Sequence, residues 1–175
     1  MKFTRNLFAL ILVSLTLTFC SDNDDSSDEN SDDCPELVSQ EAQGNFRGTD
    51  FVNQGGFYKE QTFGGNTTYR CEIYVKEATG GDCFFPEFEA PRDIILFSIE
   101  SLEQQTIEVS DLSGANTLNF NRIADGTTTI ELAECGTITI TNFDSATSTL
   151  EGTVVALGQF GSVINGAFSL ELCDL

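Results

Sequence analysis

The sequence predicts an all-β domain over residues 34–175, folded as an antiparallel β-sandwich or, as the alternative, a β-barrel. Three observations predict it. Apolar and polar side chains alternate with a period of two along about ten short runs, in which Thr and β-branched residues dominate. Turn residues interrupt these runs about every 8–12 positions. No run after the N-terminal leader has the longer period of an amphipathic helix.

The alternation assigns a face to each side chain in a run. In TTYRCEIYV, Tyr69, Cys71 and Ile73 share the apolar face. Asp125-Gly126 is a strong hairpin signal and joins two runs into a hairpin. The last three runs are expected to form an antiparallel meander. The clearest predicted strands are 67–75, 93–100, 116–123, 127–132, 136–143, 150–157 and 162–172.

A short apolar segment precedes the predicted domain. The basic start MKFTRN leads into LFALILVSLTLTF, residues 7–19. A membrane-spanning helix needs about 20 apolar residues, so this run is too short to be one. Residues 1–19 are therefore predicted to be a signal peptide for export.

The residues around Cys20 add a second signal. Leu17-Thr18-Phe19-Cys20 resembles the lipobox of bacterial lipoproteins, with Phe19 where Gly, Ala or Ser is usual. The following SDNDDSSDE resembles the acidic tether of Bacteroidetes surface lipoproteins. This resemblance implies lipidation at Cys20 and an anchored position on the outer face of the outer membrane. The alternative is a plain secretory signal cut near Thr18, with Cys20 an ordinary thiol.

The acidic tether spans residues 20–33. Residues 21–33 hold seven acids and no apolar side chain that could be buried, so the segment is expected to be disordered. It does not match an EF-hand calcium loop, because Ser27 and Asp33 stand where that loop needs Gly and Glu. No metal site is expected in it.

The C-terminal half carries a further resemblance. GTITITNFD, TLEGTVVA and VINGAFSLEL are similar to the tail of small Bacteroidetes lipoproteins, over roughly residues 90–175. That family implies a β-sandwich and brings no known activity. Asp144-Ser145-Ala146 resembles the O-glycosylation motif of the same group, which implies a modified Ser145 in an exposed turn.

The six cysteines of an exported chain indicate disulfides. Cys135 and Cys173 should not pair, because alternate strands of a meander place them at opposite ends, roughly 23 Å apart. The ends of a domain are often close, so Cys34 is expected to pair with Cys173. Cys83 is then expected to pair with Cys135, since both are predicted to lie outside regular strands. Cys71, on an apolar face, is expected to be free.

The charge of the chain bears on its partners. Residues 34–175 hold 21 acids and six bases, a net charge of −15. Such a surface repels nucleic acid and anionic lipid. The partners expected are therefore a membrane reached only through the N-terminal lipid, and a glycan or a basic protein as ligand. The chain is expected to be a monomer.

No catalytic machinery is predicted. The chain has no His, which excludes Ser-His and Cys-His nucleophiles and imidazole metal ligands. Glu87 and Glu89 could act as a carboxylate pair of a hydrolase if both lined a cleft; a solvated loop is the expected reading. No phosphate-binding loop is found, and no cofactor is expected.

Aromatic residues offer the other route to function. Phe84, Phe85 and Phe88 could form an exposed binding loop, and Tyr58 and Tyr74 could stack on a sugar, although burial in the core is expected for Phe. The sequence thus predicts a non-catalytic binding or structural module on the cell surface. The alternatives are a glycan-binding module of a polysaccharide uptake system and an acidic inhibitor of a basic enzyme.

Overall fold

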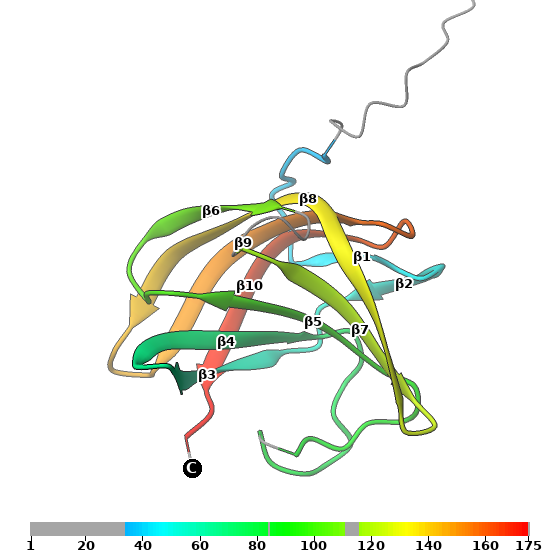
Figure 1. Ribbon diagram of the computed structural model, residues 1–175, viewed down its shortest axis with the longest axis horizontal. Coiled ribbons are helices and arrows are strands. Elements are labelled where there is room, and N and C mark those ends of the chain that lie inside the picture. Colours follow the sequence, from blue (N-terminus) through cyan, green and yellow to red (C-terminus); the bar gives the residue numbers. More distant parts are fainter. Residues whose placement is uncertain (1–33, 84, 111–115, 175) are drawn as a thin grey trace, which may run out of the picture. The chain divides into compact units, whose positions relative to one another are not determined.

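The computed structural model describes residues 34–83, 85–110 and 116–174. This part of the chain contains β-strands, turns and loops and no helix, and its strands pair into one sheet that is antiparallel at every strand pairing but one (Figure 1). The predicted all-β, antiparallel class is therefore confirmed. The signal peptide 1–19, the tether 20–33 and Cys20 lie outside the described residues.

Ten strands occur in the described ranges, and their order in the sheet departs from their order in the chain. Neighbouring strands in the order β2-β1-β10-β3-β4-β5-β7-β8-β6 are hydrogen-bonded, and β9 lies between β8 and β10. The strands are β1 (Gln43–Phe46), β2 (Thr49–Val52), β3 (Gly56–Phe63), β4 (Asn66–Tyr74), β5 (Arg92–Ile99), β6 (Gln105–Ser110), β7 (Leu118–Ala124), β8 (Thr127–Asp144), β9 (Thr149–Gly158) and β10 (Val163–Leu172).

The long strand β8 unites two of the predicted strands, 127–132 and 136–143. A β-bulge between Ala133 and Cys135 lets the strand continue while its partners change. Before the bulge, residues 127–132 pair with β7; beyond it, residues 135–140 pair with β6. The expected meander is confirmed, because β9 pairs antiparallel with both β8 and β10.

The strand pairings close on themselves into a ring, from β3 through β4, β5, β7, β8, β9 and β10 back to β3. The last junction is the parallel one and contains two pairs, Glu171 with Phe57 and Leu172 with Tyr58. The N–H of Cys173 extends this seam by donating to the carbonyl of Tyr58, at 2.8 Å. The strand β6 lies at one end of the strand order and pairs with β8 alone.

The core lies between the inner faces of two groups of strands, β6, β8, β9 and β10 on one side and β3, β4, β5 and β7 on the other (Figure 1). Phe97 of β5 meets Phe168 of β10 across this space, with ring centroids 5.6 Å apart. Gly152 provides room for Phe168, since a Cβ there would collide with the ring. The alternating pattern of the sequence thus buries one face of each strand.

A strap, residues 34–42, ties the N-terminal end of the described chain to the sheet. The N–H of Val38 donates to the side-chain oxygen of Asn165, and the Asn165 amide donates to the carbonyl of Glu36, at 2.8 and 2.7 Å. A disulfide joins Cys34 to Cys135 of β8. The strap is therefore held to β10 by hydrogen bonds and to β8 by a disulfide.

The disulfide pairing expected from the sequence is wrong. The four expected cysteines are bonded, but as Cys34–Cys135 and Cys83–Cys173, with Cα separations of 5.8 and 5.6 Å. Cys135 lies inside β8 and not in a loop, because the bulged strand continues through it. Cys71 is free and buried as expected, and its burial raises the pKa of its thiol.

We expect loss of the Cys83–Cys173 disulfide to destabilise the domain more than loss of Cys34–Cys135. The closed loops span 90 and 101 residues, so their loop-entropy contributions differ by only about 0.1 kcal/mol. Each pair of Cys→Ser substitutions should lower the free energy of unfolding by about 2–5 kcal/mol. The Cys83–Cys173 variant should lose more, because its disulfide adjoins a seam of two residue pairs. Urea denaturation measures both; an equal or larger loss for Cys34–Cys135 would contradict this account.

Candidate functional site

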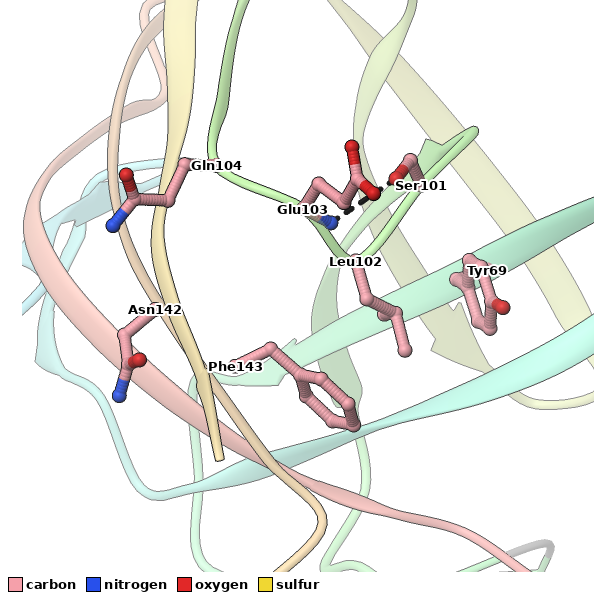
Figure 2. Close-up of a pocket in the computed structure, with 7 residues that line it drawn as sticks. All are labelled: Tyr69, Ser101, Leu102, Glu103, Gln104, Asn142 and Phe143. Atoms are coloured by element: carbon pink, nitrogen blue, oxygen red, sulfur yellow. Dashed lines mark hydrogen bonds between the residues drawn. The ribbon is translucent and has the colours of Figure 1, made fainter. Parts of the chain in front are cut away.

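An open cavity of about 680 Å³ lies at the end of the ring where β8 finishes (Figure 2). Three segments position its lining. Strand β4 contributes Tyr69, the β5–β6 connection contributes residues 101–104, and the end of β8 contributes Asn142 and Phe143. The cavity adjoins β6, the strand that pairs only with β8, so the opening lies where the sheet is not continued.

The floor of the cavity is apolar. Tyr69, Leu102 and Phe143 are half-buried and pack against the edge of the main core. Tyr58 lies beneath them and meets Tyr69 and Phe143 edge to face, each at a centroid distance of 6.3 Å. These contacts hold both rings in place, so the floor is preorganised in the chain itself.

The rim of the cavity is polar. The side chains of Ser101, Glu103, Gln104 and Asn142 surround the floor in Figure 2. Two of the amides are held by their nitrogens: Gln104 donates to the carbonyl of Thr141, and Asn142 donates to the Glu151 carboxylate, at 2.6 and 3.1 Å. The oxygen of each amide is thereby left to accept a hydrogen bond from a ligand.

The Tyr69 hydroxyl adds a donor to this arrangement. Among the described residues it makes no hydrogen bond, whereas the ring beneath it is fixed. The Glu103 carboxylate is exposed at the same rim. The cavity therefore offers hydroxyl donors and amide or carboxylate acceptors around an apolar floor, and the residues that line it include no cation.

A shallow groove of about 410 Å³ continues from the cavity and shares Gln104 with it. It follows β6 and β8, where the hydroxyls of Thr106 and Thr139 lie 3.3 Å apart. Its polar lining is again amide and hydroxyl, and no charged residue lines it. Cavity and groove together form one polar surface with an aromatic floor at one end.

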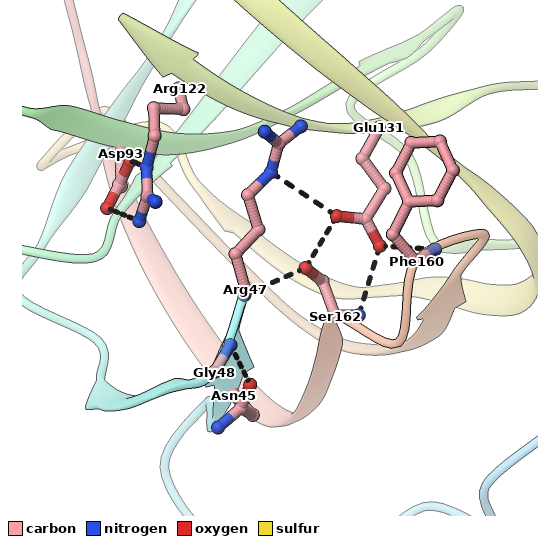
Figure 3. Close-up of polar contacts among 8 residues, drawn as sticks. All are labelled: Asn45, Arg47, Gly48, Asp93, Arg122, Glu131, Phe160 and Ser162. Atoms are coloured by element: carbon pink, nitrogen blue, oxygen red, sulfur yellow. Dashed lines mark hydrogen bonds and ion pairs between the residues drawn. The ribbon is translucent and has the colours of Figure 1, made fainter. Parts of the chain in front are cut away.

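A second polar cluster surrounds Glu131 of β8, which is fully buried (Figure 3). Its carboxylate accepts hydrogen bonds from the N–H groups of Phe160 and Ser162 and from the Ser162 hydroxyl, at 2.9, 3.0 and 2.7 Å. Arg47 completes the cluster as an ion pair at 3.5 Å. A Cβ at Gly158 would collide with this carboxylate.

The Glu131 cluster is structural. Its acceptor oxygens are occupied by the β9–β10 turn, and Glu131 lines none of the cavities described above. These hydrogen bonds fix the turn that connects two strands of the meander, β9 and β10. The cluster therefore stabilises the end of the ring opposite to the end where Tyr69 lies. It offers no free side chain for catalysis or binding.

Two more buried carboxylates form ion pairs with the remaining arginines. Asp93 binds Arg122 through two hydrogen bonds of 2.7 and 2.8 Å, which raise the pKa of Arg122. Glu72 lies between Arg70 and Arg92, at 2.6 and 3.1 Å. All four arginines of residues 34–175 are thus paired with buried acids. The other 18 acidic residues have two lysines, Lys59 and Lys76, as countercharges in that part of the chain.

The structure separates the residues proposed from sequence as a carboxylate pair. Glu89 lines a cavity of about 580 Å³ beside Asp50 and Glu77, whereas the Glu87 carboxylate lies over Gly80. Glu87 is not among the residues that line that cavity. The two carboxylates therefore do not converge on one cleft, as a glycosidase pair must.

The structure does not support the predicted exposed platform of Tyr58 and Tyr74. Tyr58 and Tyr74 are buried, and burial raises the pKa of Tyr74 to about 12, so neither forms an exposed platform. Phe88 packs on Tyr74 at 4.9 Å, and Phe85 is exposed. Phe84 lies outside the described residues.

Sequence reasoning missed Tyr69 as a residue that lines a cavity. It correctly placed Tyr69 on the inner face of its strand, but did not consider that an inner residue near a strand end opens onto the mouth of the fold. The signal was its position three residues after Asn66, where β4 begins. Ser145 lies in the exposed β8–β9 turn, where the Asp144 carboxylate accepts the Ala146 N–H at 2.8 Å; this hydrogen bond lowers the pKa of Asp144.

Comparison with protein-family models, with curated proteins and with solved structures finds no match to this chain. Among the described residues, no group of three or more His, Cys, Asp or Glu side chains is placed to hold a metal ion. That same part of the chain has no helix with the length and apolar character needed to cross a membrane.

Replacing Glu131 by Gln should lower the free energy of unfolding by about 2–4 kcal/mol. The substitution leaves Arg47 without its countercharge and places an amide nitrogen among donors. The control is Glu134→Gln, an exposed carboxylate three residues further along β8, for which a change within about 0.5 kcal/mol is expected. Chemical denaturation of the two variants measures the difference; similar stabilities would show that the cluster is dispensable.

Proposed function

We propose that this chain is a lipid-anchored, cell-surface binding module without catalytic activity, and that the cavity at Tyr69 binds a neutral glycan. The observation that carries the proposal is the pairing of a fixed aromatic floor, Tyr69 and Phe143, with a rim of amide and hydroxyl groups. The volume of about 680 Å³ lies in the range of small-ligand sites.

A sugar ring matches this lining chemically. Its C–H face is apolar and packs on the negative face of an aromatic ring, while its hydroxyls both donate and accept hydrogen bonds. The Tyr69 hydroxyl can donate to a sugar oxygen, and the oxygens of Gln104 and Asn142 can accept from sugar hydroxyls. The adjoining groove along Thr106 and Thr139 extends the same chemistry to a second sugar unit.

The charge of the site selects against anionic ligands. No cation lines the cavity, and Glu103 is exposed at its rim. An acidic sugar or a phosphate would therefore be bound without a countercharge, against the field of a chain with net charge −15 over residues 34–175. Neutral or amino-bearing sugars are the ligand class that fits.

The anchor supports a position at the cell surface. The lipobox-like Leu17–Cys20 stands at the end of the 13-residue apolar run 7–19, and the acidic residues after Cys20 resemble an export tether. A module held in this way would present its cavity to glycans outside the cell. No cofactor and no catalytic residue are part of this proposal.

A panel of neutral oligosaccharides, with uronic-acid oligosaccharides beside them, tests the site by calorimetric titration. We expect neutral sugars to bind and acidic ones not to bind. Tyr69→Phe removes only the hydroxyl and should weaken binding about threefold to tenfold, the equivalent of about 0.5–1.5 kcal/mol for one neutral hydrogen bond.

Gln104→Ala tests the rim in the same titration and should weaken binding by a similar factor. Its matched control is Gln159→Ala, an exposed amide in the β9–β10 turn, which should bind as the unaltered chain does. Preference for acidic sugars, or equal binding by all variants, would refute the assignment of the cavity.

The anchor is tested through Cys20. In cells treated with globomycin, which blocks the lipoprotein signal peptidase, a larger uncut precursor should accumulate. Cys20→Ala should move the chain from the membrane to the soluble fraction, whereas the neighbouring control Ser21→Ala should stay in the membrane. A mature N-terminus before Cys20, measured by mass spectrometry, would contradict lipidation.

A further inference from the structure

The connection between β4 and β5, residues 75–91, is a long loop closed at its neck. The N–H of Thr79 donates to the carbonyl of Glu87, and the N–H of Glu87 donates to the carbonyl of Gly80, each at 2.8 Å. These two bonds form a short antiparallel bridge. The loop lies below β3, β4 and β5 in Figure 1, on the same side as the C-terminal end of β10.

The loop is also braced from its inner side. The Cys83–Cys173 disulfide fixes one side of its tip, and Phe88 packs edge to face on Tyr74 on the other. Arg92 lies over the Phe88 ring at 5.0 Å. Both sides of the tip are therefore fastened to the second core cluster of the fold, Phe57, Tyr74, Ile94 and Cys173.

Phe85 stands at the tip between these fastenings and is 78% exposed. Its N–H donates to the Asp82 carboxylate at 2.9 Å, which fixes the backbone of the tip. Cys83, two residues before it, is held by its disulfide, and Glu87, two residues after it, is held by the hydrogen bonds of the neck. The loop therefore presents an aromatic side chain to solvent in a held backbone, the form that binding anchors take.

The loop that carries Phe85 is acidic. Glu77, Glu87 and Glu89 are exposed on the same loop. The one basic residue of the loop, Lys76, donates its ammonium to the carbonyl of Pro91 at 3.1 Å. The four arginines face three buried carboxylates, so only one of their positive charges is left to balance exposed acids. The field of this acidic loop repels an anionic membrane or a second copy of the chain and attracts a cationic protein.

We propose that the β4–β5 loop is a docking element for a basic protein, in which Phe85 enters an apolar pocket that is rimmed by Lys or Arg side chains. The loop carboxylates then pair with that rim, which sets the orientation and speeds association. None of the residues lining the cavity at Tyr69 belongs to this loop, so this inference is independent of the glycan site.

A phage-displayed library of random cyclic peptides, selected against the full chain, tests the proposal. The enriched peptides should carry at least two Lys or Arg residues beside an apolar side chain. For synthetic copies of these peptides, Phe85→Ser should weaken binding at least tenfold, and raising the salt concentration should weaken it further.

Two variants complete the test. Phe160→Ser removes another exposed phenylalanine, in the β9–β10 turn, and should leave binding unchanged. Glu77→Gln with Glu89→Gln should reduce both the affinity and its salt dependence. The proposal is overturned if no peptide is enriched, if the enriched peptides are not basic, or if Phe85→Ser binds them as tightly as Phe160→Ser does.

Discussion

The closure of the strand ring between β10 and β3 is the constraint on which the rest of the structure depends. Strand β10 pairs with β9 along nine residues but with β3 along two. Three further links reinforce the seam: the Cys83–Cys173 disulfide, the Cys173–Tyr58 backbone bond, and the Tyr58 hydroxyl, which donates to the carbonyl of Ser148 at 3.2 Å. Because these links hold the two groups of strands together, the inner faces enclose one apolar core.

The same closure explains where the candidate sites lie. The ring is complete at the seam, whereas β6 has no partner on its second edge, and the cavity at Tyr69 forms beside it. The disulfide that follows the seam also fastens the β4–β5 loop. One bond thus contributes to two properties, the enclosure of the core and the presentation of Phe85.

The distribution of charge links stability to recognition. Three carboxylates, Glu72, Asp93 and Glu131, are buried, and an unpaired buried charge would be costly. The four arginines pair with these three groups, so only one of their positive charges remains to balance the acids at the surface. The acidic exterior follows from the excess of acids over bases, 21 against six in residues 34–175. It disfavours anionic ligands at the cavity and favours a cationic partner at the loop.

The sequence by itself determined the strand class, the inner face of β4, the C-terminal meander and the free Cys71, because these depend on local periodicity and neighbouring turns. Only the tertiary structure decided the disulfide partners, the ring closure and the sites. Cys135 pairs with Cys34 because the bulge carries β8 through it, and Tyr69 and Phe143 line one cavity because strands far apart in the chain end together. Such contacts depend on strand order and on the bending of β8, and a pattern of period two carries information on neither.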